Sequence, residues 1–333
     1  MMLWETVDSG IPRINLGEWV DTAFNWVDDH FGEALNNFGD SLENLNNSLA
    51  DLLMSPDMLV MAIIFSLLAW LLRDWKIALV SLVGLVLVIG MDQWDNTMDT
   101  LALVFLATLV ALVIGIPIGI AAARWQRFSS TVRPVMDLMQ TMPAFVWLVP
   151  VVTLFGLGPA GGLVATVIFA LPPGVRLTEL GIRQVDAEVV EAGQAFGGTP
   201  RQILGGIQMP LAMPTVMAGV NQVIMLALSM AVVAGLIGGG GLGGAVISAL
   251  QRLDVGLGFE AGLSVVILAI YLDRCTASVG NRRPGKGRLR AIIGRSRKNK
   301  STPNGPDQQG GDNLPPEAYA RPPGTAATGG VAF

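Results

Sequence analysis

Long apolar runs are the feature that most constrains this chain. Such runs of about 18 residues or more recur along the sequence, long enough for helices to cross roughly 30 Å of hydrocarbon. Only 14% of the 333 residues are charged, whereas an average soluble domain has about 25%. The sequence therefore predicts an all-α, polytopic membrane protein.

The composition also excludes several kinds of site. The chain contains one cysteine, Cys275, and one histidine, His30. It therefore cannot form an internal disulfide framework, a cysteine-based zinc or iron–sulfur site, or a histidine-cluster metal site. We expect no bound metal and no catalytic residue. Because the first residues lack the basic and apolar regions of a cleavable signal peptide, we expect the spans themselves to drive insertion.

The distribution of charge predicts the topology. Residues 1–57 hold eleven acidic residues and one basic residue, whereas residues 274–300 hold ten basic residues and no acid. With the N-terminus outside, 19 of the 21 basic residues lie on the cytoplasmic side, in agreement with the positive-inside rule. We therefore predict a multi-pass plasma-membrane protein with a cytoplasmic C-terminus. About seven transmembrane helices are expected, at 58–72, 77–91, 100–123, 139–157, 161–178, 211–237 and 259–273.

The first 57 residues predict an amphipathic helix. Apolar residues recur every three or four positions from Val20 to Leu52, over about ten turns, and breaks are conceivable at Gly32 or Gly39. This external segment is either an interfacial scaffold helix on the outer surface or an arm that packs on protein. Its acidic polar face differs from the basic face of helices that bind anionic lipid, which favours contact with protein as well as membrane.

The remaining chain divides into three parts. Residues 58–96 contain two additional transmembrane helices, and residues 97–274 form the predicted core. Residues 275–333 are first basic and then rich in Pro, Gly and small polar residues, which predicts a disordered cytoplasmic tail. The basic stretch is typical of a topology anchor that contacts membrane lipid. We expect no nucleic-acid partner, which is the less favoured interpretation of these charges.

The cytoplasmic connection at 178–210 is the only long inner loop. It predicts one helix from Asp186 that stops at Gly197-Gly198, and a second that begins with Thr199 as N-cap and ends before Pro210. Two short helices joined by a glycine turn make a compact knob on which a soluble subunit can dock. The alternative is a re-entrant or interfacial hairpin that only connects two spans.

Residues in this loop resemble the EAA loop of ABC importer permeases. The spacing agrees at every motif position, and the chain departs from the pattern with Gly193 in place of the second alanine and Met209 in place of leucine. The matching positions are Glu191, Ala192, Gly193, Gly197, Ile207, Met209 and Pro210. Segments such as MQTMPAFVWLVPVVTLFGLGP and IFALPPGVRLTELGI make the chain similar to the permease subunits of glycine betaine/proline-type importers of compatible solutes, over about residues 97–274.

The resemblance implies a type I ABC importer permease fold and a set of partners. The family's EAA loop fits a groove on a separate ATP-binding subunit, with Glu191, Ala192 and Gly197 at the core of the contact. Two such subunits, a second copy of this chain and an extracytoplasmic solute-binding protein are expected. The chain has no G-x-x-x-x-G-K-[ST] phosphate loop, so we expect ATP and magnesium on the partner, no cofactor on this chain and no enzymatic activity of its own. Betaine, proline, choline and carnitine are not distinguished.

Polar residues in the spans suggest a translocation path. The candidates are Gln140, Thr141, Trp147, Asn221, Gln222 and Ser229. Each can line a path or instead bond across helices, and the Trp147 ring can instead pack or offer a cation–π face to a quaternary ammonium. No acidic residue lies in the middle of a predicted span, which disfavours coupling to protons or sodium.

The glycine run at 238–244 is the candidate outer gate. Gly239 and Gly240 belong either to a close-approach or hinge segment, or to a flexible outer turn. A second hypothesis for the whole chain is a self-contained secondary carrier or channel in which this run lines the pore. A carrier is expected to show internal repeats, and none is found. A third hypothesis is a membrane scaffold without transport; the spaced motif in the loop disfavours both.

Overall fold

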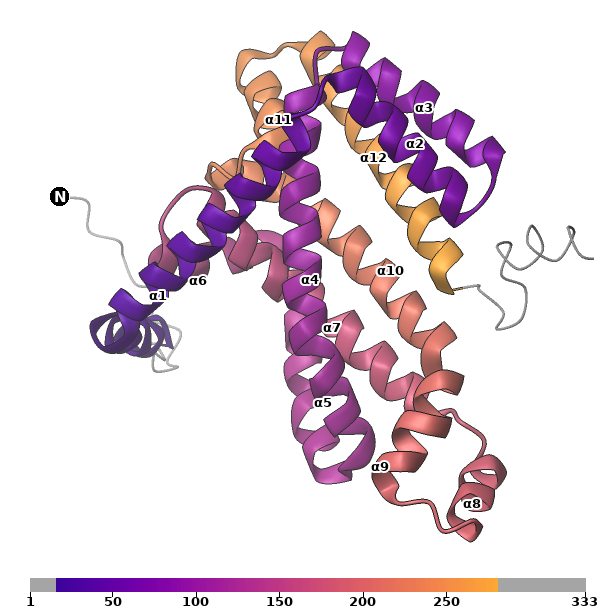
Figure 1. The fold of residues 1–333 in the computed structure, drawn as a ribbon. Coiled ribbons are helices and arrows are strands. Elements are labelled where there is room, and N and C mark those ends of the chain that lie inside the picture. Colours follow the sequence, from indigo (N-terminus) through magenta and orange to yellow (C-terminus); the bar gives the residue numbers. More distant parts are fainter. Residues whose placement is uncertain (1–15, 281–333) are drawn as a thin grey trace, which may run out of the picture. The chain divides into compact units, whose positions relative to one another are not determined.

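The computed structural model describes residues 16–280, and this part of the chain folds into helices joined by short turns (Figure 1). The predictions for 1–15 and 281–333, which include nearly all of the basic tail, lie outside the described residues. Within the described range the elements contain no strand, in agreement with the predicted all-α class.

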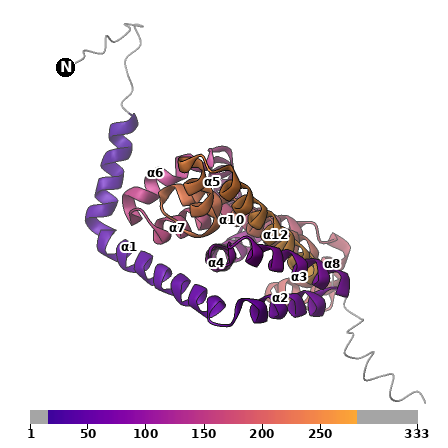
Figure 2. The same cartoon turned by 90° about the horizontal axis from the view of Figure 1, so that it is seen from above.

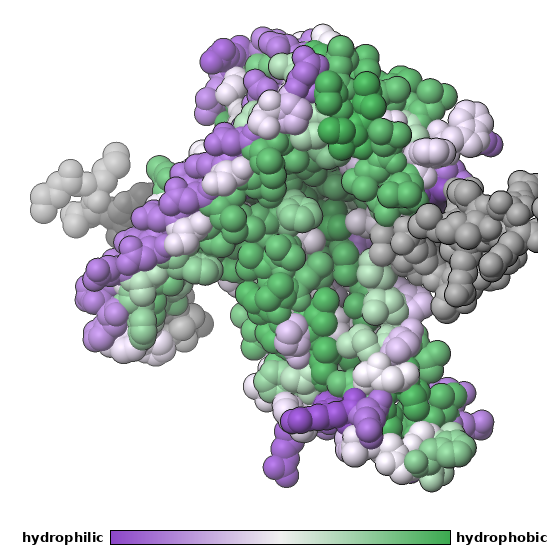
Figure 3. Space-filling view, viewed as in Figure 1, coloured by the Kyte–Doolittle hydropathy of each residue, from purple (hydrophilic) through white to green (hydrophobic). Residues whose placement is uncertain are grey.

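The first helix, α1 (Leu16–Met54), is a single helix of 39 residues without a break at either glycine. Part of its apolar side, including Leu42 and Ala50, is buried against α4, α6 and α7. Phe31 and Phe38 stay about half exposed at 52% and 51%. The other helices therefore cover only part of the apolar stripe of α1. The polar side follows α1 as a purple band in Figure 3. The predicted amphipathic helix is confirmed, and it does pack on protein.

Two short apolar helices follow, α2 (Met58–Leu72) and α3 (Trp75–Gly90). They pack on each other and on α12 (Val255–Gly280). Ser66 Oγ donates to the Ala78 carbonyl at 2.8 Å, and Tyr271 Oη donates to the Phe65 carbonyl at 3.2 Å. Both helices fall short of the roughly 20 residues that a helix perpendicular to the bilayer needs.

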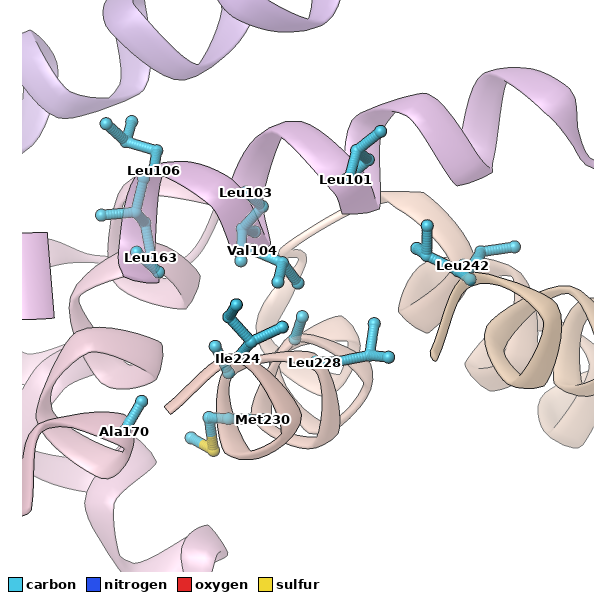
Figure 4. Close-up of a cluster of buried hydrophobic side chains, with 14 of the residues drawn as sticks. Leu101, Leu103, Val104, Leu106, Leu163, Ala170, Ile224, Leu228, Met230 and Leu242 are labelled. Atoms are coloured by element: carbon cyan, nitrogen blue, oxygen red, sulfur yellow. The ribbon is translucent and has the colours of Figure 1, made fainter. Parts of the chain in front are cut away.

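Three long helices form the centre of the described part: α4 (Trp94–Arg124), α7 (Pro159–Arg183) and α10 (Met209–Ala234). Figure 4 shows their buried side chains meeting, among them Val104, Leu163 and Leu228. Lipid tails are as apolar as these side chains, so association depends on tight packing rather than on escape from water. Gly119 shows this, because a Cβ there would lie 2.6 Å from the Val175 carbonyl oxygen on α7.

The predicted span 139–157 is wrong as a single helix. The chain forms α5 (Gln126–Thr141) and α6 (Ala144–Phe155), which meet at an angle of 103°. The cause is Pro143, which has no N–H to donate and pushes the preceding residue out of the helical region. Met142 accordingly has φ −72° and ψ 135°.

The connection between the last two predicted spans also differs from the prediction. A 3-10 turn (Gly235–Ile237) ends α10, and the glycine run then starts a further helix, α11 (Gly241–Arg252), that the sequence did not predict. Helix α12 extends the predicted span 259–273 at both ends. By length and composition, four helices in the described residues can cross a membrane, or up to six if α1–α2 and α5–α6 each count as one bent span. The count of seven is not confirmed, because one predicted span is broken and α3 is short.

Candidate functional site

The knob in the long loop at 178–210 begins as the sequence predicts. Helix α8 (Ala187–Ala195) starts at Asp186, whose carboxylate accepts the Glu188 N–H at 3.0 Å. Helix α9 (Pro200–Ile203) starts at Thr199 with a capping box, in which Thr199 Oγ1 caps the Gln202 N–H and Gln202 Oε1 accepts the Thr199 N–H at 2.9 Å. These caps satisfy backbone donors that the first turn of each helix leaves unpaired.

The turn between the two helices requires glycine at one position. Gly198 N–H donates to the Gly193 carbonyl at 3.1 Å, and Gly197 N–H donates to the Gln194 carbonyl at 2.8 Å. This pair of bonds is a Schellman motif, which places Gly197 in the left-handed region at φ +80°. Side chains other than glycine are strained there, so Gly197 fixes the direction of the chain between α8 and α9.

The second helix does not end before Pro210, and that prediction is wrong. Helix α9 continues through a π turn (Leu204–Gln208) into α10, and Pro200–Ile237 is one apolar stretch of 38 residues. Met209 N–H donates to the Leu204 carbonyl five residues back. Because proline cannot donate and its ring clashes with the carbonyl four residues earlier, the wider turn lets the helix pass Pro210 without a break.

The departure from the EAA pattern at Gly193 has a packing explanation. A Cβ on Gly193 would lie 2.5 Å from Ile207 Cδ1, so glycine lets α8 approach the π turn closely. Ile203 is buried at the same contact. Ile207 therefore acts inside the knob, while Pro210 is exposed at the start of α10.

The outward side of the knob combines charge and apolar surface. Glu191 and Ala192 are exposed, and Phe196 is 93% exposed next to the Gly197 turn. Val189 on α8 is 41% exposed. Sequence reasoning missed Val189 and Phe196, although an aromatic residue directly before a glycine pair was a usable signal. A cavity of about 350 Å³ lies between α8 and the ends of α4 and α7, with Glu191 in its lining.

The candidates on α10 separate into two groups. Gln222 and Ser229 are exposed and lie seven residues apart, on the same side of the helix. Asn221 instead faces α12, where its amide donates to Asp273 Oδ1 at 3.0 Å and accepts the Thr276 hydroxyl. These bonds support the interpretation that Asn221 bonds across helices rather than lines a path. Because α12 continues to Gly280, Asp273 lies inside a helix rather than at the end of a span as predicted.

The candidates on α5 and α6 surround the bend. Gln140 and Thr141 are exposed at the last turn of α5. Trp147 Nε1 donates to the Met139 carbonyl at 3.3 Å, across the break, and its ring is half-buried. Trp147 thus braces the bend by satisfying a carbonyl that lost its helical partner. No hydrogen bond in the described part of the chain joins this group to Gln222 or Ser229.

The glycine run at 238–244 is closely packed. Gly239 is buried, and a Cβ on it would lie 2.8 Å from the Ala234 carbonyl oxygen. Gly240 is exposed, with open space around it and φ +74°. The Leu242 N–H at the start of α11 donates to Thr100 Oγ1 on α4 at 2.8 Å. These contacts describe a close approach of backbones rather than a loose turn.

A charged cluster near the knob escaped sequence reasoning. Glu179 on α7 is 5% exposed, and its Oε1 accepts Ser129 Oγ at 2.7 Å, Arg133 Nη2 at 2.8 Å and Arg183 Nε at 2.8 Å. A cavity of about 330 Å³ lies beside it. The sequence contains no local signal for this cluster, because Ser129 and Arg133 are 50 and 46 residues from Glu179. Among residues 16–280 no group of His, Cys, Asp and Glu could hold a metal ion.

These features define a class of protein: a polytopic helical membrane protein that presents a two-helix knob between two long spans. The family model described as "Binding-protein-dependent transport system inner membrane component" matches residues 115–279. The glycine betaine/proline betaine transport system permease protein ProW of Escherichia coli (strain K12) is 50% identical over 239 residues, which are 72% of this chain and 68% of that protein. The glycine betaine transport system permease protein OpuAB of Bacillus subtilis (strain 168) is 47% identical over 229 residues, 69% of this chain and 81% of that protein.

A solved structure of the MetNI methionine ABC transporter, in an inward-facing conformation, contains a chain of the same fold. The TM-score is 0.51 at 21% identity, over 54% of this chain and 91% of that one. The chain belongs to the binding-protein-dependent transport system inner membrane components, as the motif resemblance predicts. It is therefore a multi-pass membrane subunit of an ABC importer and not itself a catalytic subunit. Membership decides against the self-contained carrier or channel and against the scaffold without transport.

Proposed function

We propose that this chain forms the translocation path of an ATP-driven importer for glycine betaine and similar compatible solutes. The observation that carries the proposal is the capped knob α8–α9, which carries Glu191, Ala192, Gly193 and Gly197 of the EAA pattern. The substrate class is supported by the printed names of the relatives, which specify glycine betaine and proline betaine. ATP and magnesium bind to the partner subunit, two copies of which serve two copies of this chain, and this chain binds no cofactor.

Docking on the ATPase subunit uses the outward side of the knob. Glu191 offers a charge, Ala192 leaves room for close approach, and Phe196 supplies an apolar side chain that is 93% exposed. A large apolar side chain exposed beside charge is typical of a protein contact. Gly197 gives the knob its fixed turn, Gly193 and Ile207 pack against each other inside it, and Pro210 lies at the start of α10, just after the π turn.

The path is lined from α10 and from the α5–α6 bend. Gln222 and Ser229 share one exposed side of an otherwise apolar helix, and polar side chains at membrane depth are favourable only against protein or a cavity. The backbone freed at the bend near Gln140 and Thr141 has the same requirement. A second copy of the chain provides the opposite wall. Asn221 and Trp147 support the path through their hydrogen bonds rather than by contact with solute.

The outer end of the path is closed by the packed glycine run. Gly239 and Gly240 lead into α11, which the Thr100 hydroxyl holds on α4. An extracytoplasmic solute-binding protein docks on this side, opposite the knob. The acidic α1 then lies outside and the basic tail in the cytoplasm, with anionic lipid as its neighbour.

The first prediction tests docking in the complete importer reconstituted in liposomes. Gly197→Asp strains the turn and Glu191→Lys reverses the charge on the contact surface, so each should reduce ATP-driven betaine uptake at least about tenfold, equal to about 1.4 kcal/mol of coupling. The matched control, Glu33→Lys, reverses an exposed glutamate on α1 and should keep uptake. Normal uptake by Gly197→Asp would refute docking through the knob.

The second prediction tests orientation. A cysteine in place of the exposed Asn36 on α1 should react with an impermeant thiol reagent added to intact cells, because eleven acids and one base precede the first span. A cysteine in place of the exposed Glu188 on α8 should react only after the cells are opened. Labelling of Glu188→Cys in intact cells, with Asn36→Cys protected, would reverse the topology.

A further inference from the structure

Helix α5 is attached to α7 mainly by polar contacts. Its buried residues are Ser129, with no exposed surface, and Met136. Ser129 Oγ and Arg133 Nη2 both donate to Glu179 Oε1 on α7, at 2.7 and 2.8 Å. One turn further, Asp137 on α5 forms an ion pair with Arg176 on α7, with the charges exchanged between the helices. Two ion pairs of opposite polarity therefore fix the register of α5 along α7.

Glu179 is the centre of this attachment. Its side chain is 7% exposed, and one carboxylate oxygen accepts a hydroxyl and two guanidinium groups. A buried carboxylate is costly unless it is paired and hydrogen-bonded. Removal of its charge would take an ion-pair partner from both Arg133 and Arg183 and leave the Asp137–Arg176 pair as the remaining ion pair between α5 and α7, so this one side chain carries much of the attachment of α5.

The contacts continue from Glu179 to the knob. Arg183, which shares Glu179 Oε1, donates to the Ala122 carbonyl and to Gln126 Oε1, each at 2.8 Å. Arg183 thereby caps the end of α4, where the last carbonyls lack helical partners. From that end, Arg124 Nη2 donates to the Pro200 carbonyl of α9 at 2.6 Å. Figure 1 shows α5, α8 and α9 at the same end of the long helices.

We infer that Glu179 is a positioning residue for coupling: it holds α5 to the end of α7, so that α5 and the knob α8–α9 move as one body when the ATPase subunit acts. The inference rests on the proposed docking of the knob and extends it to a second element. On this inference, motion of the knob is transmitted to α5. Helix α5 ends at the bend that contains Gln140 and Thr141, so motion of the knob reaches the proposed path through polar contacts rather than through α10 alone.

Spin-label distances in an importer that keeps Glu179 test directly whether α5 and the knob move as one body. Labels replace Ser130, exposed on α5, and Glu188, exposed on α8, in a Cys275→Ala background. In importers in which only one of the two copies carries both labels, we expect one narrow distance distribution that is the same without nucleotide and with ATP trapped on the ATPase subunits. A shift or a second peak on ATP binding would overturn the inference. This measurement does not depend on whether a Glu179 variant folds.

A variant then separates coupling from stability. Glu179→Gln keeps the shape and removes the charge, and we expect the ratio of betaine uptake to ATP hydrolysis to fall about fivefold or more, the lower end of common coupling energies. Glu179→Asp keeps the charge, which the long arginine side chains can follow, and should retain most of the ratio. Glu33→Gln on α1 is the matched exposed control. A broader spin-label distance distribution in Glu179→Gln would show that α5 loses its fixed position relative to the knob, as the inference requires.

The two failures are distinguishable. If Glu179→Gln keeps the normal ratio while Gly197→Asp loses uptake, the knob docks and the positioning role is wrong. If Gly197→Asp itself transports normally, the docking proposal is wrong, and the inference about Glu179 fails with it.

Discussion

The long helical stretch that contains α10 has a glycine turn before it and another after it, and the two use glycine differently. Before it, Gly197 has φ +80° and nothing within 4 Å of a built Cβ. After it, Gly243 has ordinary helical geometry, but a Cβ there would lie 2.7 Å from the Ala231 carbonyl oxygen. The first turn needs only a backbone conformation at Gly197. The segment after α10 needs positive φ at Gly238, Gly240 and Gly241 and, in addition, space at Gly239 and Gly243.

The two uses of glycine have different consequences for how firmly each turn is held. A glycine chosen for its conformation leaves the surface around it open, which suits the proposed docking of the knob on another subunit. A glycine chosen for space brings backbones into contact and fastens α11 to α10. Four consecutive glycines in a sequence suggest flexibility, yet here they form the more tightly packed of the two turns.

The largest effect should come from filling the packed turn. Gly243→Ala places a methyl group against the carbonyls of Ala231 and Val232, which cannot swing away, and should lower the free energy of unfolding by about 3 kcal/mol. Gly244→Ala, one residue on, meets open space and should be neutral or stabilising by up to about 1 kcal/mol. Thermal unfolding of the two variants in detergent measures the difference. Equal stability of both would mean that the outer turn is loose.

A smaller effect is expected at the open turn. Gly197→Ala should lower the free energy of local opening of α8 by about 1 kcal/mol, because alanine is strained in the left-handed region although it fits the space. The strain should appear as roughly fivefold faster hydrogen exchange in α8, with global stability unchanged. Gly205→Ala, with no atom within 4 Å and no positive φ, is the control. Faster exchange in the control and not in Gly197→Ala would contradict the conformational explanation.

The smallest effect is expected at Gly193, which has no positive φ and whose built Cβ meets the end of a flexible side chain rather than backbone. Its built Cβ overlaps Ile207 Cδ1, the far end of a flexible side chain, so Gly193→Ala should change stability by less than about 0.5 kcal/mol. Uptake should stay within about twofold of wild type, since the change only restores the alanine of the family pattern. A loss of uptake comparable to that of Gly197→Asp would show that Ile207 cannot rearrange.

Local patterns predicted much of the fold. The spacing of apolar residues predicted α1, and Asp186 and Thr199 predicted two helix starts, because each signal acts within one or two turns. Pro143 was visible, but an apolar run on both sides of it concealed the bend. Helix α11 was missed because it begins with glycines, which are poor helix formers, and because the hydrogen bond from the Leu242 N–H to Thr100 on α4 joins residues far apart in the sequence.

The sequence indicates candidate site residues where a motif is local and gives no signal where the contacts are not local. The EAA residues occupy one continuous loop, so their spacing alone locates them. Glu179 gathers donors from α5 and α7, and no periodicity in the sequence connects Ser129 to a residue 50 positions later. Asn221 and Trp147 were found as polar groups in spans, but their partners, Asp273 and the Met139 carbonyl, decide that they brace helices.

The π turn at Leu204–Gln208 sets an angle as well as passing a proline. A π turn contains one residue more than an α turn, and each residue of an α-helix advances the side chains by about 100°. Had the same residues continued as a regular helix, Gln222 and Ser229 would point about a quarter of a turn away from their present direction relative to the knob. The single extra residue thus acts as an angular offset between the surface proposed to meet the ATPase and the surface proposed to meet the solute.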